Sequence, residues 1–350
     1  MRLDLHRHLE GSHSPRALLE VARAFDLRAG PFFDEARQVF RSVAELTPEI
    51  TLSTPSDDAS HFYRCIVRAR AAYANVEAVG ALAQLAFREA AEETDGFEMR
   101  VSLFSMARTV IENQRLAWRD VPPTAFAEDW ARPLLIAILA ARDAVVAEAG
   151  KPILLRLGLS RTFESEAHYR ALAAMAIEHA PALVGLDVLG IVAGADQEPM
   201  PAALLDILDG LRAHLPDLTV HAGEFEGHAS VERTLALSPR AIGHGVRSLE
   251  SPATLERLAR EGVTLEVCPS SNRLLIPTAL AALEHAHRRT PLAALQRASV
   301  HCVLGSDDPT PLRTSYRRER ELAAELGVNL ARLDADTRRR WHQLAPEATL

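Results

Sequence analysis

Cysteine is scarce in this chain, and the few cysteines present do not form the pattern of a disulfide framework. The 350 residues include only Cys65, Cys268 and Cys302, an odd number without any close spacing. Small secreted proteins that depend on disulfides carry many cysteines in even-numbered, closely spaced sets. The sequence is therefore typical of a protein from a reducing compartment, and we expect it to be cytoplasmic.

A basic surplus and long apolar runs are also missing. The chain has 39 Lys and Arg residues against 47 Asp and Glu residues, which gives a formal net charge of −8, with the acids dispersed. Nucleic-acid binding relies on basic patches that release counterions from phosphates, so we expect no nucleic-acid partner. No apolar run reaches membrane-spanning length, and the first strand pattern begins at Leu3, which leaves no room for a cleaved signal. We therefore expect no membrane partner.

The chain does contain a regular alternation of short apolar, strand-like runs with Ala-, Leu-, Arg- and Glu-rich segments that favour helix. Strands joined by helical crossovers predict a parallel (β/α)8 barrel of the TIM type, and such a barrel with insertions can fill residues 1–350 as a single domain. The helical segments include 76–93, 125–149, 202–214 and 252–261. The expected strands are 3–8, 97–104, 152–159, 183–192, 218–224, 241–246, 263–268 and 301–307.

One stretch, from residue 30 to about residue 73, interrupts this alternation between the first and second strand runs. It carries extra helical material punctuated by Pro31, Pro48 and Pro55 and a cluster of Ser, Thr and Asp. An insertion on this side would overhang the mouth of the barrel. It therefore predicts either a lid or pocket wall, or plain surface helices.

Histidines and acids gather where the strand runs end, which is where a parallel barrel places its chemistry. His6 and His8 are two residues apart in the first run, so both face the barrel interior while Arg7 faces the helices. His221 lies at the end of the fifth run, and Asp307 ends the eighth, which closes the barrel beside the first. Three imidazoles and one carboxylate suit a divalent metal such as zinc, with a further position open for water in a catalytic site.

Two further groups lie near this predicted metal site without being needed to hold the ion. Glu224 lies three residues beyond His221, past a small Ala-Gly turn, and would be free to carry protons. Partial burial beside a metal can tune the pKa of a carboxyl for such a role. His244 lies between two glycines at the end of the sixth run, where a close approach of the backbone is allowed.

Five motifs, LDLHRHLEGS, HAGE, IGHGV, CPSSN and LGSDDP, occur in this order from Leu3 to about Tyr316. Together they resemble the adenosine deaminase family of the amidohydrolase superfamily. The resemblance implies a zinc-dependent hydrolytic deamination at C6 of a purine, without an organic cofactor. The metal ligands that it implies are His6, His8, His221 and Asp307.

The same resemblance implies roles for the remaining groups of the site. Glu224 would donate a proton to purine N1, and His244 together with Asp307 would position the nucleophile. The residues implied in substrate binding are Asp308, which would bond N7, Gly190, whose backbone N–H would bond N3, and Glu10 and Gly11.

Lys151 is the only lysine in the chain, and it precedes the third strand run, at the barrel end opposite the predicted site. Two-metal amidohydrolases usually bridge their metals with a carbamylated lysine at a strand terminus, and this chain has none available there. We therefore expect one metal ion per chain. The Pro-Cys-x-x-Cys signature of cytidine-type deaminases is missing as well, because Cys268 is followed by Pro269 and Ser270.

The substrate-binding positions depart from the family pattern more than the catalytic positions do. Position 10 is Glu, as in adenine-type relatives, where nucleoside-specific members often carry Asp, and Ile191 and Val192 replace the usual acidic pair after Gly190. Adenosine is therefore one candidate substrate beside adenine, a modified nucleoside or another aminated heterocycle. Two other interpretations stay open: a catalytically silent barrel that binds a purine-like ligand, and a hydrolase with one metal that acts on a non-purine ring.

Overall fold

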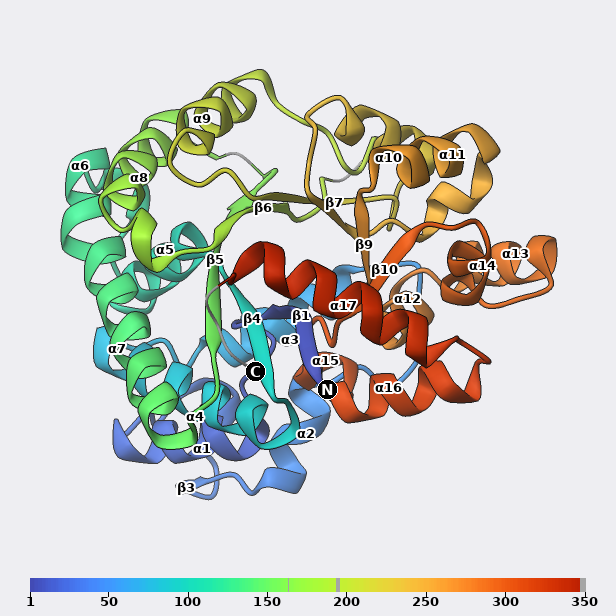
Figure 1. Ribbon diagram of the computed structural model, residues 1–350. Helices are drawn as coiled ribbons and strands as arrows, with labels where there is room; N and C mark the ends of the chain where they lie inside the picture. The colour runs from blue at the N-terminus through green and yellow to red at the C-terminus, as the bar shows by residue number, and fades with distance from the viewer. Residues whose placement is uncertain (163, 193–195, 347–350) are drawn as a thin grey trace.

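The computed structural model describes residues 1–162, 164–192 and 196–346; residues 347–350 of the predicted domain lie outside the described part. Eight parallel strands form a barrel with helices around it, which confirms the predicted fold (Figure 1). In order around the barrel, the strands are β1 (Leu3–His8), β4 (Gly96–Val101), β5 (Ile153–Ser160), β6 (Gly185–Leu189), β7 (Leu218–Ala222), β8 (Ala241–His244), β9 (Thr264–Val267) and β10 (His301–Leu304).

The barrel closes between β1 and the segment that follows β10. The backbone N–H of His8 donates to the Asp307 carbonyl at 2.8 Å, and the Asp307 N–H donates to the His6 carbonyl at 2.7 Å. These bonds hold Asp307, whose φ is +61°, directly beside the two histidines of β1. The closure of the barrel thus also brings the first and last parts of the predicted metal site together.

Helices surround the strands, and none of the helices in the described residues is long and apolar enough to cross a membrane. The α-helices are α1 (Pro15–Ala24), α2 (Val43–Ile50), α3 (Ser60–Arg70), α4 (Val76–Glu93), α5 (Leu103–Asn113), α6 (Pro123–Ala125), α7 (Arg132–Ala149), α8 (Glu166–Glu178), α9 (Ala202–Arg212), α10 (His228–Leu235), α11 (Pro252–Glu261), α12 (Pro269–Leu275), α13 (Pro277–His287), α14 (Pro291–Arg297), α15 (Pro309–Leu312), α16 (Tyr316–Glu325) and α17 (Leu330–Leu344). The shorter helical segments are η1 (Gly30–Phe32), η2 (Trp118–Asp120), η3 (Phe126–Ala131), η4 (Ala180–Ala182) and η5 (Val246–Glu250).

Helix ends follow the sequence closely where capping residues mark them. The predicted segment 252–261 coincides with α11, because the Ser251 side chain accepts a hydrogen bond from the Thr254 N–H and Gly262 ends the helix at φ +66°. The predicted segment 76–93 coincides with α4, which is capped by Asn75. The segment 125–149 is instead divided into a π-helical turn, η3, and α7.

Several predicted strands extend too far toward the site; the run 301–307, for example, is a strand only over His301–Leu304. Two other runs show the reason. The run 97–104 is a strand only as far as Val101, and Leu103 already begins α5. The run 183–192 is a strand only over Gly185–Leu189, because Gly190 turns the chain at φ +85°. In both places apolar residues continue past the strand, since a buried helix or turn requires them as much as a strand does.

The 30–73 insertion is not purely helical. It contains η1, α2 and α3 together with a small antiparallel pair, β2 (Phe33–Asp34) and β3 (Val39–Phe40). Helix α3 packs over the barrel end where the strands finish, and its contacts there form an apolar cluster. The buried members of this cluster are Leu52, Phe62, Cys65, Ile66, Leu275 and Leu312.

Helix α17 crosses the opposite end of the barrel, where the strands begin (Figure 1). Trp341 of α17 is buried against Leu3 and Leu5 of β1. Arg340 donates two hydrogen bonds to Asp217, just before β7, at 2.6 and 2.7 Å. The end of the barrel away from the predicted site is therefore covered.

Candidate active site

The side chains predicted to bind a metal lie together at the end of the barrel where the strands finish. His6 Nε2 and His8 Nε2 are 3.3 Å apart, and they lie 3.6 and 3.4 Å from Asp307 Oδ1. The ring centroid of His221 is 4.7 Å from that of His6 and 5.2 Å from that of His8. All four side chains are buried, so they would hold an ion away from bulk water.

The second ring nitrogen of two of these histidines faces a buried acid. His6 Nδ1 lies 3.1 Å from Glu266 Oε2, and His221 Nδ1 lies 3.0 Å from Asp187 Oδ1. An imidazole that donates its Nδ1–H to a carboxylate keeps a lone pair on Nε2, the nitrogen available for a metal. The chemistry of this set of donors therefore fits a divalent ion such as zinc.

Arg100 of β4 joins the two supporting acids. Its Nε donates to Asp187 Oδ2 at 2.7 Å, its Nη2 donates to Glu266, and the whole side chain is buried. Arg100, Asp187 and Glu266 were not among the site residues predicted from the sequence. Each is a single charged residue between apolar neighbours in a strand (MRV, LDV and LEV), and this is the signal by which they could have been found.

Lys151 lies just before β5, at the end where the strands begin, and its Nζ donates to the Ala91 carbonyl. The Lys151 side chain thus lies at the end of the barrel away from the histidines. This placement agrees with the reasoning that led us to expect one metal ion, which stays a prediction.

By distance alone, His244 of β8 belongs to the same cluster. One ligand atom from each of His6, His221, His244 and Asp307 lies within 4.8 Å of the others. His244 Nε2 is 4.0 Å from Asp307 Oδ2 and 3.5 Å from Glu224 Oε2. Distance therefore does not decide whether His244 binds the ion or a group beside it.

The acids of the site differ in charge because their surroundings differ. Burial and the negative charge of Asp307 raise the pKa of Glu224 well above its usual range, which favours the protonated carboxyl. The same two causes raise the pKa of Asp308. Asp307 itself is buried, yet the adjacent imidazoles of His6 and His244 hold its pKa well below the usual range. One anion thus lies beside two acids that can act as hydrogen-bond donors.

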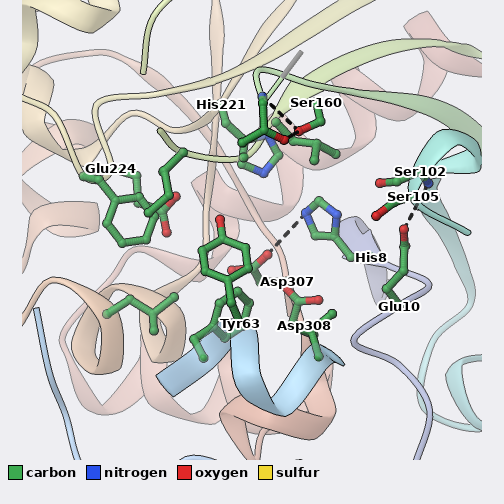
Figure 2. Close-up of a pocket in the computed structure, with 18 of the residues that line it drawn as sticks. His8, Glu10, Tyr63, Ser102, Ser105, Ser160, His221, Glu224, Asp307 and Asp308 are labelled. Atoms are coloured by element: carbon green, nitrogen blue, oxygen red, sulfur yellow. Dashed lines mark hydrogen bonds and ion pairs between the residues drawn. The ribbon is translucent and has the colours of Figure 1, made fainter. Parts of the chain in front are cut away.

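A cavity of about 400 Å³ opens directly over this cluster (Figure 2). Glu10, Ser102 and Ser105 lie on one side of it, and Tyr63 of α3 points into it. The predicted site residues that line it are His8, Glu10, Gly190, His221, Glu224, His244, Asp307 and Asp308. Gly11 is not among the lining residues, but a Cβ there would lie 1.8 Å from Asp308 Oδ1, so glycine makes room for the Asp308 carboxyl.

The sequence model described as adenosine deaminase matches residues 2–340 of this chain. The chain belongs to the adenosine deaminase family. An adenine deaminase from Mesorhizobium japonicum is 42% identical over 123 residues, which cover 35% of this chain and 36% of that protein. The matched segment thus spans just over a third of this curated relative.

Solved structures support the fold. A zinc-bound amidohydrolase from Burkholderia ambifaria superposes with a TM-score of 0.71 at 17% identity, covering 99% of this chain and 90% of that one. The N6-methyl-AMP deaminase from Arabidopsis thaliana superposes with a TM-score of 0.70 at 19% identity, covering 98% and 91%. The barrel of this adenosine deaminase family member is therefore shared by metal-binding and deaminating proteins.

Glu198, a buried acid on the loop that follows β6, was also not among the predicted site residues. Its carboxylate accepts hydrogen bonds from three consecutive backbone N–H groups, those of Gly223, Glu224 and Phe225, at 2.8, 3.1 and 3.0 Å. Ser230 also donates to it. Glu198 thereby fixes the backbone that carries Glu224. Because the three groups that it holds there are backbone N–H groups, no motif could have revealed this contact.

Arg70, at the end of α3, is a second cavity residue that the motifs of the adenosine deaminase family did not indicate. Its Nη1 donates to Ser105 Oγ at 2.7 Å, and its Nη2 lies 3.6 Å from Glu10 Oε1. The Ser102 N–H donates to the same Glu10 oxygen at 3.2 Å. Through Arg70 and Tyr63 the inserted segment forms part of the cavity wall.

Proposed function

We propose that this protein is a zinc-dependent deaminase that hydrolyses adenosine or a related 6-aminopurine and releases ammonia. The observation that carries the proposal is the placement of Glu224. Its carboxyl is buried in the cavity, its surroundings favour protonation, and it lies 3.5 Å from His244 beside the four proposed metal ligands. A catalytically inactive barrel that only binds a ligand would not require a buried, protonated carboxyl in this position.

The chemistry of the site follows from these groups. A divalent ion held by His6, His8, His221 and Asp307 would act as a Lewis acid and supply a hydroxide nucleophile at neutral pH. Glu224 donates its proton to purine N1, which withdraws electron density from C6 and prepares it for addition of the nucleophile. His244 would hold the nucleophilic oxygen in position. The Glu224 carboxylate, having given its proton to N1, would take up the hydroxyl proton of the tetrahedral centre and pass it to the amino group, so that C6 keeps the oxygen as a carbonyl and ammonia leaves.

Two lining residues would orient the ring. The raised pKa of Asp308 favours a carboxyl that can donate a hydrogen bond, which suits the lone pair of purine N7. The backbone N–H of Gly190 would donate to N3, and both residues line the cavity. These contacts would set C6 toward the histidine cluster.

The substituent on the ring distinguishes the candidate substrates. The group of Glu10, Arg70 and Ser105 gives the cavity a polar side that suits the hydroxyls of a sugar, as in adenosine. Adenine is the second candidate, because Glu10 is the residue of adenine-type relatives and the Mesorhizobium protein is named adenine deaminase.

We further propose that the protein acts in the cytoplasm, in keeping with its three free cysteines.

An ammonia-release assay on zinc-loaded protein tests the proposed function. The panel contains adenosine, adenine, deoxyadenosine, methylated adenines that keep a free 6-amino group, and aminopterins as non-purine rings. We expect turnover of at least one 6-aminopurine, and none after treatment with a chelator. Release of ammonia only from aminopterins would contradict the proposal, as would silence across the whole panel.

Substitutions of Asp308 test how the ring is held. We expect Asp308→Ala to lower kcat/KM by about 10- to 100-fold, because a donor to N7 is lost in a buried site. Asp308→Asn keeps a donor and is expected to retain more activity than the alanine variant. Steady-state kinetics on the best substrate of the panel decide this. An unchanged rate in Asp308→Ala would favour a ring without N7.

A further inference from the structure

Asn272, the last residue of the CPSSN motif, has no role so far. It lies on α12, the short helix after β9, and its side chain is only 1% exposed. Its Nδ2 lies 3.2 Å from His244 Nδ1, and both groups are buried. Asn272 does not line the cavity, so it can act on the reaction only through His244.

The orientation of the amide follows from what surrounds it. The other amide atom, Asn272 Oδ1, is buried without a hydrogen-bond partner among the described residues. An unpaired buried carbonyl oxygen is tolerated better than an unpaired buried amide N–H. With the amide turned round, its NH2 group would take that unpartnered place. The orientation in which the Asn272 amide donates to His244 is therefore favoured, because it leaves only a carbonyl oxygen, and no N–H group, without a hydrogen bond.

A ring nitrogen that accepts a hydrogen bond carries a lone pair, so the proton of the neutral imidazole must lie on the other nitrogen. For His244 that nitrogen is Nε2, which faces carboxyl oxygens: Glu224 Oε2 at 3.5 Å and Asp307 Oδ2 at 4.0 Å. A protonated Nε2 suits both neighbours. The contacts on the two sides of the ring thus agree on one tautomer.

The same rule gives the opposite result for the metal-binding histidines. His6 and His221 have carboxylates at Nδ1, so Nδ1 carries the proton and Nε2 carries the lone pair. His244 has an amide donor at Nδ1, so its Nε2 carries a proton and cannot bind a metal. We propose that Asn272 is a positioning residue that fixes His244 as the Nε2–H tautomer, which keeps it out of the metal's coordination and makes it a hydrogen-bond donor to the nucleophile.

The surroundings of α12 are rigid enough for this role. The Asn272 N–H donates to the Cys268 carbonyl at 3.0 Å, and the Ser270 N–H donates to Glu319 Oε2 at 3.0 Å. Glu319 belongs to α16 and is fully buried. The backbone that carries Asn272 is therefore held by contacts within its own helix and with a second helix.

The tautomer can be measured directly by NMR on protein with 15N-labelled histidine, without substrate and without metal. Long-range 1H–15N correlations distinguish a protonated Nε2 from a protonated Nδ1, and the His244 signals are assigned by their loss in His244→Gln. We expect the Nε2–H form in the wild type. We expect Asn272→Asp to move the proton to Nδ1, because a carboxylate accepts where the amide donated.

Kinetics give a second readout, which rests on the proposed function. A catalytic imidazole held in the wrong tautomer costs serine proteases about 10⁴-fold in kcat, so we expect Asn272→Asp to lose about 100-fold or more with little change in KM. Ser271→Ala, on the same helix turn and equally buried, is the control and should change neither tautomer nor kcat.

The two readouts separate the possible failures. An Nδ1–H signal in the wild type would overturn the proposal, and so would an Nε2–H signal that persists in Asn272→Asp. If Asn272→Asp does not fold, the wild-type spectrum alone still decides. A failed substrate panel would leave the tautomer result standing, because the spectrum needs no turnover.

Discussion

Replacement of Glu224 by Gln is expected to lower kcat by about 10²- to 10⁴-fold, the range that a positioned general acid contributes. Gln is almost isosteric with Glu and still hydrogen-bonds, but it has no acidic proton to give to N1. Because the carboxyl is not among the proposed ligands, the variant should still bind one metal ion per chain. Steady-state kinetics and elemental analysis of the same preparation test both parts.

The pH profile of the wild type also tests whether Glu224 acts as the proton donor. Only the protonated form of Glu224 can donate, and the raised pKa keeps this form present at higher pH than for an ordinary carboxyl. We expect kcat/KM to fall on the alkaline side as Glu224 ionises. Glu232 is an acid on the exposed side of α10, and Glu232→Gln is the matched control, which should leave the profile unchanged.

The metal content of Glu224→Gln separates the two possible roles of this residue. Loss of the metal from Glu224→Gln would show that Glu224 is a ligand and contradict this account.

Replacement of Arg100 by Met is expected to have the largest effect on stability. The guanidinium is fully buried between Asp187 and Glu266, so its removal leaves two buried carboxylates without their cation. Breaking a buried ion pair in this way costs about 3–5 kcal/mol. We also expect metal affinity to fall about 10- to 100-fold, because the two acids orient His221 and His6.

The test of Arg100 compares the same substitution in two places. Arg170→Met removes an arginine from an exposed ion pair with Asp206 and should change the free energy of unfolding by less than about 1 kcal/mol. Urea unfolding of the metal-free proteins measures stability, and competition with a chelator measures zinc affinity. Equal effects of the two substitutions would show that Arg100 does not support the site.

The part of the site predicted from sequence is the part whose chemistry is local. His6 and His8 are two residues apart in a strand, so their common direction follows from strand geometry. The alternation of strands and helices likewise predicts that His221 and Asp307 lie at the end of the barrel where the strands finish. Capping explains why the bounds of α11 were predicted to the residue, since Ser251 and Gly262 are visible in the sequence.

The part that could not be predicted depends on contacts between distant segments. Arg100, Asp187 and Glu266 come from three different strands. A charge within an apolar strand indicates a buried polar group, but the sequence does not show which distant residue it pairs with. Glu198 bonds backbone N–H groups about 25 residues away, which any sequence would present. The predicted strand 97–104 extended past Val101 because an apolar residue such as Leu103 occurs in buried helices as readily as in strands.

The central claim is that one divalent ion is held by three imidazoles and Asp307, with Glu224 and His244 close by but not bound to it. A crystal structure of the zinc-loaded protein, with anomalous data collected at the zinc absorption edge, tests this most directly. The account predicts a single peak per chain at the end of the barrel where the strands finish, coordinated by His6, His8, His221 and Asp307. A second peak of equal height, or a zinc ion bound by His244 or Glu224, would contradict it.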